Sequence, residues 1–382
     1  MKKRLISILL IIILSFGFST AYADMGLSAK AYLLMDFNTG EIILAKNEHD
    51  RLPPASITKI MTLLIAMEYL ANGSLKLDEE VIISESASKA IGTSVYLDAG
   101  EVQTVESLLK AICIRSANDA SIALAVHIAG SEETFVDLMN ERAAQLGMEN
   151  TNFKNSSGLP EEDHYTSAYD IGIMSRELMK HEEIIPYLTT YMEDMKVGKS
   201  KPSVQTMVNT NRLIKDYEGA NGIKTGSTSE AKYCLSASAK RGDLQLIAVV
   251  MGAETSALRF TEAAKLLDYG FANYESTVIG RRGDVVADIP IEKGKEDSLS
   301  IILERDSHLL LPKGEKANIE KDILYPDHIK APIEQGQKIG EYIVKLDGQE
   351  IDRINLVAKS EIGKASLVHL LKKLWENFLF GK

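Results

Sequence analysis

The first two thirds of the chain alternate between two periods of hydrophobic residues. Apolar runs at Ala31–Asp36 and Glu41–Ala45 flank Phe37-Asn38-Thr39-Gly40, a pattern that predicts a β-hairpin. From Ser56 to Ala71 the apolar residues recur every three to four positions, which predicts an amphipathic helix. Thr104 precedes a similar pattern and is placed to cap its helix, so strands and helices are both expected in this region.

Further helices and strands are predicted beyond these. Residues 119–129 are apolar nearly all round, as expected of a central, buried helix. Helices are also predicted at Glu132–Leu146, closed by Gly147, at Ser167–His181 and at Phe260–Phe271, and strands at Cys234–Ala239 and Leu244–Met251. The mixture indicates an α+β unit, for which we expect the bounds 24–275.

Helical periodicity disappears after about residue 275. Short alternating runs replace it at Leu299–Leu303, Tyr342–Leu346 and Ile351–Val357, and Asp347-Gly348 joins the last two as a hairpin turn. We expect residues 276–363 to form a small β domain.

The last segment is amphipathic. Its apolar helical face holds Leu367, Leu370, Leu371, Leu374, Phe378 and Leu379, and Trp375 and Phe380 widen that face. A terminal helix of this kind, with lysines on its polar side, can lie in a membrane interface. We predict a membrane-associating helix at 364–382; the alternative is a helix that docks on its own protein.

The first residues form an export signal. The basic residues Lys2, Lys3 and Arg4 precede an apolar stretch of 14 residues, Leu5 to Phe18, and the small-x-small sequence 21–23 follows. The apolar stretch is shorter than the roughly 20 residues of a membrane span. We therefore expect residues 1–23 to be a cleaved signal peptide, with an uncleaved anchor as the alternative, and the mature protein to be extracytoplasmic.

Length and charge narrow the function. A chain of 382 residues is long enough for two folded units. The net charge is −11, and removal of three basic residues with the signal makes it −11 − 3 = −14, which argues against nucleic acid as a partner. Cys113 and Cys234 stand in apolar sequence and are expected to be buried thiols. Zinc-type Cys/His spacing is absent from the sequence, so neither a metal nor an organic cofactor is expected.

Three short motifs stand in a fixed order. The chain has four S-x-x-K matches, beginning at Ser56, Ser86, Ser107 and Ser229, so at least three of them are accidental. Ser116-Ala117-Asn118 is the sole S-x-N and Lys224-Thr225-Gly226 the sole K-T-G. Ser56 follows Pro53-Pro54, where a helix can begin. The order Ser56–Lys59, Ser116–Asn118, Lys224–Gly226 predicts one shared site.

These residue types suit nucleophilic catalysis. The serine hydroxyl needs a base, and on a helix Lys59 can reach Ser56 because positions i and i+3 share a face. Burial and a nearby Lys224 would favour the neutral, basic form of Lys59, and Lys224 would also attract a substrate carboxylate. Ser116 can relay a proton to a leaving group, and Asn118 can bind substrate backbone, although either could merely cap the next helix.

The sequence after Lys224 reads as a strand that could pair with an extended peptide. Gly226 permits a close approach of that strand to its neighbours. Backbone N–H groups of Ser56 and of a residue near Ser229 on the strand would form an oxyanion hole.

The motifs and their flanks resemble the serine penicillin-binding proteins and β-lactamases. The flanks are similar to the low-molecular-mass D-alanyl-D-alanine carboxypeptidases, peptidase family S11. They comprise Pro54 to Thr62, Ser116 to Ala120, Asn155 to Pro160, His164-Tyr165-Thr166 with Asp170, Asn209 to Leu213 and Gly222 to Thr228. Asn221 departs from the family pattern, in which an aspartate is commoner.

The resemblance implies an antiparallel sheet flanked by helices, with a helical subdomain and the site between the two. It implies hydrolysis of stem peptides ending in D-Ala-D-Ala, with acylation and inhibition by β-lactam antibiotics. Ser56 would be the nucleophile, Lys59 the base and Ser116 the proton relay, and the substrate would bind to Asn118, Lys224, Thr225, Gly226 and Thr228. His164 and Asp170 are either supporting or purely structural.

Other functions share the three motifs. A class A β-lactamase needs a glutamate in a Glu-x-x-Leu-Asn sequence, and only Glu161 and Glu162, in a different context, occupy part of the interval before Lys224. A transpeptidase would pass the acyl group to an amine. A penicillin sensor would need a second apolar run of about 20 residues, which the sequence lacks. The carboxypeptidase remains the preferred hypothesis.

Overall fold

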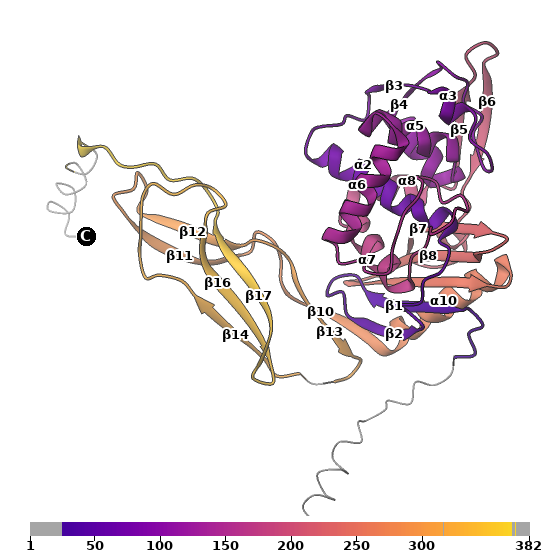
Figure 1. The fold of residues 1–382 in the computed structure, drawn as a ribbon. Coiled ribbons are helices and arrows are strands. Elements are labelled where there is room, and N and C mark those ends of the chain that lie inside the picture. Colours follow the sequence, from indigo (N-terminus) through magenta and orange to yellow (C-terminus); the bar gives the residue numbers. More distant parts are fainter. Residues whose placement is uncertain (1–24, 316, 369–370, 372–382) are drawn as a thin grey trace, which may run out of the picture.

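The computed structural model describes residues 25–315, 317–368 and 371. Two units are distinguished in Figure 1: an N-terminal unit, residues 25–273, and a β unit, residues 274–364, that extends to one side of it. The predicted signal 1–23 and most of the predicted helix 364–382 lie outside the described residues. Within the described ranges, no helix is long and apolar enough to cross a membrane.

A five-stranded antiparallel sheet forms the centre of the N-terminal unit. Its order is β2 (Ile42–Lys46), β1 (Ala31–Asp36), β9 (Leu244–Ala253), β8 (Lys232–Arg241) and β7 (Ala220–Thr228). The predicted hairpin is present as β1 and β2. The sheet begins with strands from the start of the chain and ends at β7, which therefore lies at an edge.

Both faces of the sheet are buried. Along β9 every residue is buried, and alternate side chains enter two hydrophobic clusters: Ile247 and Val249 on one face, Leu246 and Ala248 on the other. The helix α10 (Ser256–Asn273) covers the second face, and α7 (Ala168–Met179) packs on the first. Burial on both faces explains why β9 is apolar without alternation.

Apart from α9 (Leu213–Asp216), whose Leu213 packs in the cluster on the α10 side, the remaining helices form a subdomain on the α7 side of the sheet. They are the 3₁₀ turn η1 (Ala55–Thr58), α2 (Lys59–Ala71), α3 (Glu85–Ser88), α4 (Val105–Lys110), η2 (Ala111–Arg115), α5 (Asn118–Ala129), α6 (Glu132–Gln145), η3 (Glu182–Ile184) and α8 (Ile185–Thr189). Thr104 caps α4 by accepting a hydrogen bond from Ser107 N, as its position predicts. α5 is buried over most of its length, in agreement with its uniformly apolar sequence.

Two small two-stranded antiparallel sheets lie at the outer end of this subdomain and are not evident in the hydrophobic pattern. β3 (Glu80–Ile82) pairs with β4 (Val102–Thr104), and β5 (Met192–Val197) pairs with β6 (Ser203–Val208). Most residues of β5 and β6 are exposed or half-buried.

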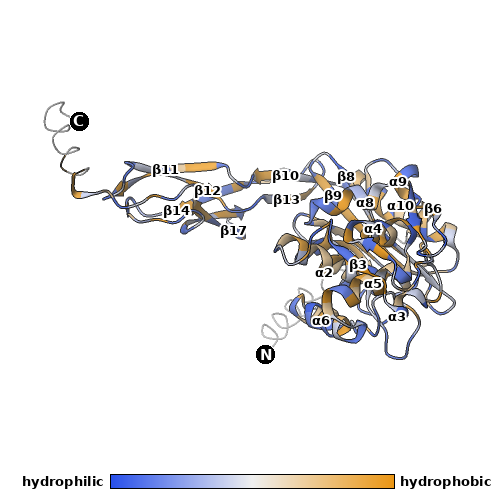
Figure 2. Ribbon diagram, turned by 90° about the horizontal axis from the view of Figure 1, so that it is seen from above, coloured by the Kyte–Doolittle hydropathy of each residue, from blue (hydrophilic) through white to orange (hydrophobic). Residues whose placement is uncertain are grey.

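The β unit has its own core. β10 (Tyr274–Gly280) pairs with β13 (Ser307–Pro312), and a six-stranded sheet has the order β14 (Ile319–Leu324), β16 (Lys338–Leu346), β17 (Gln349–Ala358), β12 (Ser298–Leu303), β11 (Val285–Glu292) and β15 (Ile329–Lys330). Apolar segments alternate with polar ones along these strands (Figure 2). The third hydrophobic cluster, which includes Ile301, Val344 and Leu356, lies within this unit. At the predicted hairpin turn, Asp347 and Gly348 both have positive φ angles, of 50° and 82°.

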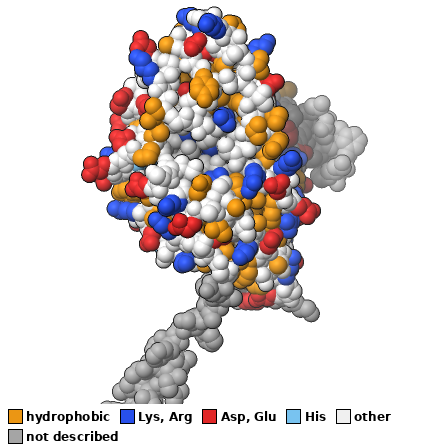
Figure 3. Space-filling view, turned by 90° about the vertical axis from the view of Figure 1, so that its right-hand side faces the viewer, with side chains coloured by type: hydrophobic (Ala, Val, Ile, Leu, Met, Phe, Trp, Pro, Cys, Tyr) orange, Lys and Arg blue, Asp and Glu red, His pale blue; other side chains and the backbone are white. Residues whose placement is uncertain are grey.

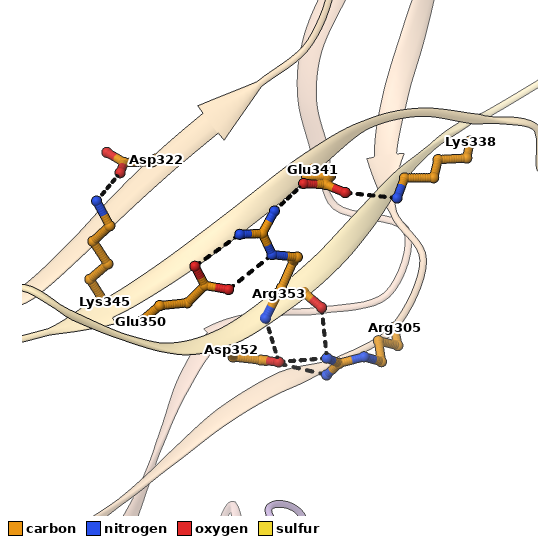
Figure 4. A network of polar contacts seen from close by, with 8 residues as sticks. All are labelled: Arg305, Asp322, Lys338, Glu341, Lys345, Glu350, Asp352 and Arg353. Atoms are coloured by element: carbon orange, nitrogen blue, oxygen red, sulfur yellow. Dashed lines mark hydrogen bonds and ion pairs between the residues drawn. The ribbon is translucent and has the colours of Figure 1, made fainter.

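Ion pairs line the outside of the β unit (Figure 4). Arg353 pairs with Glu350 and Glu341, and Arg305 pairs with Asp352. Arg353 is 47% exposed and Glu350 42% exposed, so water screens the pair.

Candidate functional site

The first motif stands where η1 passes into α2. Ser56 lies on η1, and Ala55 before it has a φ of 49°, an uncommon value for a residue with a side chain. A Cβ on Gly226 would lie 2.9 Å from the Pro54 carbonyl oxygen, and a Cβ on Gly158 would lie 1.9 Å from that of Ala55. Two glycines from distant parts of the chain thus let their backbones close around the serine.

Lys59, the first residue of α2, is fully buried. Its Nζ lies 3.1 Å from Ser56 Oγ, as the i,i+3 spacing predicts. Nζ also lies 2.6 Å from Asn118 Oδ1 and 2.6 Å from the Ser157 carbonyl oxygen. A neutral amine has two N–H donors and one lone pair. With the two oxygens accepting the N–H groups, the lone pair is left for the hydroxyl proton of Ser56.

The electrostatics of the site favour the neutral amine. Burial is the largest cause that holds the pKa of Lys59 well below its ordinary value, and the positive charge of Lys224 lowers the pKa further. Asp119 and Glu132 act in the opposite direction and raise it.

Ser116 follows a π-helical turn, η2, and has a left-handed backbone with φ 65° and ψ 34°. Its hydroxyl is buried and has no hydrogen-bond partner within the described part of the chain. π-turns and left-handed non-glycine residues are concentrated at functional sites. A buried hydroxyl without a partner is available for a proton that arrives with substrate.

Asn118 is not a helix cap. Ala117 occupies the cap position of α5 and Asn118 is the first helical residue, so the capping alternative is wrong for this side chain. Its Oδ1 accepts from Lys59, and its Nδ2 donates to the Ile91 carbonyl oxygen at 2.7 Å. The amide therefore orients the lysine.

The third motif lies within β7. Lys224 is 1% exposed, and burial lowers its pKa to about 7. Thr225 Oγ1 donates to Thr210 Oγ1 at 2.8 Å, and Thr228 Oγ1 accepts from Ala231 N at 3.0 Å. Ser229 follows the end of the strand, so an oxyanion donor on β7 has to come from a residue at or before Thr228.

His164 and Asp170 support the loops around the serine. His164 Nε2 lies 2.9 Å from Thr58 Oγ1, and burial lowers the pKa of the imidazole to about 4. Asp170 accepts hydrogen bonds from Asn150 N and from Thr151 Oγ1. His164 thus holds the Thr58 side chain and Asp170 holds the loop at 150–151, and neither side chain is hydrogen-bonded to Ser56.

Three contributors were not among the predicted site residues, although Asp119 and Ser157 lie within the flanks that resemble the family. The carbonyl oxygen of Ser157 is a backbone atom, which side-chain patterns do not reveal. Glu132 accepts from Ser156 N at 2.9 Å and so fixes the turn that presents this oxygen. Asp119 is 2% exposed and bonds to the loop at Val95 and Leu97. The signal for Asp119 was its charge inside a sequence that is otherwise apolar.

A cavity of about 580 Å³ adjoins the segment that leads to Ser56. Ala55, Gly158, His164 and Thr228 are among the residues that line it. Cys113 and Cys234 are buried thiols, as expected. On the face of the N-terminal unit that points away from the β unit, acidic and basic side chains are interspersed (Figure 3). No extended basic patch suited to nucleic acid is visible on that face.

Two family models match the chain. The model described as D-alanyl-D-alanine carboxypeptidase matches residues 18–255. The model described as the C-terminal domain of penicillin-binding protein 5 matches residues 274–364.

Relatives and solved structures match from about two thirds to nearly all of this chain. The D-alanyl-D-alanine carboxypeptidase DacF of Bacillus subtilis is 42% identical over 98% of this chain and 100% of its own. The crystal structure of penicillin-binding protein 5 from Haemophilus influenzae has a TM-score of 0.69 at 32% identity, covering 88% of this chain and 98% of that one. A serine-to-alanine mutant of the Streptomyces K15 DD-transpeptidase has a TM-score of 0.60 at 31% identity, covering 64% and 98%.

Proposed function

Because the chain belongs to the D-alanyl-D-alanine carboxypeptidase family, we propose that Ser56 is the nucleophile with which it removes the terminal D-alanine of peptidoglycan stem peptides. The chain is a serine-type D-alanyl-D-alanine carboxypeptidase and a penicillin-binding protein. Its substrate is a pentapeptide ending in D-Ala-D-Ala, and its products are the tetrapeptide and free D-alanine. β-Lactams acylate the same serine.

One observation carries the assignment of the base. Lys59 Nζ contacts Ser56 Oγ, Asn118 Oδ1 and the Ser157 carbonyl oxygen, and burial lowers its pKa. The neutral amine takes the Ser56 proton as Oγ bonds to the carbonyl carbon of the penultimate D-alanine. The peptide bond then breaks, and its nitrogen receives a proton through the Ser116 hydroxyl as D-alanine leaves. Water later attacks the ester, with Lys59 taking its proton, and regenerates Ser56.

Substrate positioning follows from the edge strand. The ammonium of Lys224 and the hydroxyl of Thr225 bind the terminal carboxylate, and an extended peptide pairs with β7 up to Thr228. Gly226 keeps this strand close enough to Ser56 for the scissile carbonyl to reach it. Asn118 can bind the substrate backbone only if its hydrogen bond with Lys59 or with Ile91 is replaced by one to the substrate.

We infer that hydrolysis of the penicilloyl ester is slow. Fast deacylation needs a carboxylate that activates water. Glu161 and Glu162 are exposed, and Glu132 is bonded to Ser156. The carboxylates near the site thus support a carboxypeptidase over a β-lactamase.

We propose export by residues 1–23, a catalytic domain at 24–275, a β domain at 276–363 that serves as a spacer, and a membrane-associating helix at 364–382. The separate hydrophobic cluster of the β unit and the separate family matches support this division. Deletion of 365–382 is expected to leave activity in solution intact and to abolish binding to vesicles of anionic lipid. Unchanged vesicle binding would refute the anchor.

The test of the nucleophile is intact mass spectrometry of residues 24–382 after brief exposure to benzylpenicillin, beside the Ser56→Ala variant. Free D-alanine released from a D-Ala-D-Ala peptide is assayed in parallel. One penicilloyl adduct on the parent, none on the variant, and Ser56-dependent D-alanine release are expected. An adduct without D-alanine release would favour a sensor or a transpeptidase, and an added amine acceptor separates these two. An adduct on Ser56→Ala would exclude Ser56 as the nucleophile.

A further inference from the structure

The segment of residues 91–97 lies against the second motif. Asn118 N donates to the Thr93 carbonyl oxygen at 2.7 Å, and Asn118 Nδ2 donates to that of Ile91, also at 2.7 Å. A Cβ on Gly92 would lie 2.9 Å from Asn118 Nδ2, so the segment is packed as closely as glycine allows. The position of Asn118, and through it that of Lys59, depends on where this segment is held.

The carboxylate of Asp119 holds the segment of residues 91–97 in place. Val95 N donates to both oxygens, at 3.2 and 3.1 Å, and Leu97 N donates to Oδ2 at 3.1 Å. Between them Tyr96 has a φ of 65° and a side chain that is 67% exposed. A strained, exposed residue flanked by two anchored N–H groups indicates that the carboxylate imposes the shape of the segment.

Asp119 also acts on Lys59 through its charge. The charged groups that act on Lys59 come from three elements: Lys224 on β7, Asp119 on α5 and Glu132 on α6. Lys224 lowers the pKa of Lys59, whereas the two carboxylates raise it. Asp119 is the more influential carboxylate and, at 2% exposed, is poorly screened by water.

We propose that Asp119 is a positioning residue for the acylation of Ser56: its carboxylate fastens residues 91–97 against Asn118 and supplies negative charge near the buried Lys59. The inference rests on the proposed roles of Ser56 and Lys59. Asp119 does not touch the reacting atoms. Its two effects are separable, because one depends on the shape of the carboxylate and the other on its charge.

Two substitutions separate them. Asp119→Asn keeps the size and removes the charge. Its one carbonyl oxygen can replace either Oδ2, which accepts from Val95 N and Leu97 N, or Oδ1, which accepts from Ala120 N, and the NH₂ group in the other position cannot accept. Asp119→Glu keeps the charge and displaces the oxygens by one methylene. The matched control is Glu101→Gln. Glu101 is 6% exposed and accepts from Asp98 N at 2.8 Å, just beyond the segment, yet it is not among the charges that shift the pKa of Lys59.

The measurement is the second-order rate of acylation by benzylpenicillin as a function of pH, followed by intact mass. In Asp119→Asn the rate is expected to fall about tenfold, because the negative charge is lost and the NH₂ group faces a buried backbone N–H that has lost its acceptor. The decline of the rate at low pH, the acid limb of the profile, should also move to lower pH, because loss of the negative charge lowers the pKa of Lys59. Asp119→Glu should lose rate with its acid limb unmoved, and Glu101→Gln should leave the limb unmoved.

An unchanged rate in Asp119→Asn overturns the proposal. So does a loss of rate without a shift of the acid limb, since that would reduce Asp119 to a packing residue, and so does an equal shift in Asp119→Glu or Glu101→Gln. If Asp119→Asn does not fold, as judged by thermal unfolding, Asp119→Glu against Glu101→Gln still decides whether position 119 controls the rate. Ser56→Ala is run alongside: an adduct on that variant would mean that the proposed nucleophile, not the inference about Asp119, has failed.

Discussion

In the N-terminal unit Lys59 and Lys224 are buried, whereas in the β unit Arg353 and its acidic partners lie on an exposed surface. Burial lowers the pKa of both lysines, and one of them to about 7. The exposed pairs of the β unit have water and salt as competitors. Basic side chains are therefore placed to take part in chemistry where burial lowers their pKa, and remain ordinary charged surface groups where water surrounds them.

The largest effect is expected from a side chain at position 59 that cannot lose its positive charge. In Lys59→Arg the guanidinium stays protonated at any pH the protein survives, so no base is present for Ser56. Acylation by benzylpenicillin is expected to fall about 10²- to 10⁴-fold, the usual contribution of a general base. Stopped-flow measurement of the acylation rate checks this. A rate within about threefold of the parent would contradict the role of a neutral lysine.

The next largest effect is expected from adding a methyl group to a closely packed glycine near Ser56. In Gly158→Ala the new Cβ would meet the Ala55 carbonyl oxygen at 1.9 Å, so the nucleophile segment must move. We expect a loss of roughly 1–3 kcal/mol in the free energy of unfolding and a lower acylation rate. The matched control in the β unit is Gly348→Ala, with nothing within 4 Å of its Cβ and a similar φ of 82°. Urea unfolding and acylation rates compare them, and equal losses of activity would contradict the packing argument.

A smaller effect is expected from the pH dependence of Lys224. Its pKa of about 7 means that the free enzyme loses this positive charge as pH rises through that value. Recognition of the carboxylate should weaken, so kcat/KM for a D-Ala-D-Ala peptide should fall several-fold on the alkaline side. Lys224→Arg keeps its charge and should lack this alkaline limb, even if its overall rate is lower. The same alkaline limb in both proteins would assign it to another group.

The smallest effect is expected on the surface of the β unit. Arg353→Gln removes the contacts to Glu350 and Glu341, which are exposed and screened. Carboxypeptidase activity should not change, and the melting temperature should fall only slightly, less so at high salt. Differential scanning calorimetry at two ionic strengths tests this. A marked, salt-independent loss of stability would show that the surface network matters more than its exposure indicates.

Much of the fold could be predicted, because buried helices and strands can be recognised from the pattern of apolar residues in the sequence. β9 and α5 are buried nearly all round, and both stand out as apolar runs. The hairpin β5–β6 is mostly exposed, so its sequence has no such pattern. The residues 1–23 and most of 364–382 lie outside the described residues, and the export signal and the terminal helix remain predictions.

The contacts within the site also divide into those that the sequence predicts and those that it does not. The contact of Lys59 with Ser56 follows from helical spacing within four residues. The contact of Lys59 Nζ with the Ser157 carbonyl oxygen joins residues 98 positions apart, and a backbone atom cannot be recognised from residue types. The actual orientation of Asn118, toward Lys59 and Ile91, depends on the π-turn before it, which local propensities did not predict.

The open edge of the central sheet has a consequence for the behaviour of the protein at high concentration. β7 ends the sheet, and an unpaired edge is a template on which a second molecule can add a strand and begin aggregation. Lys224 places a buried charge in the middle of that edge. A carboxylate-terminated peptide compensates the charge, whereas an internal stretch of another chain does not. Lys224, which we propose to bind the substrate carboxylate, would thus also protect the strand from self-association.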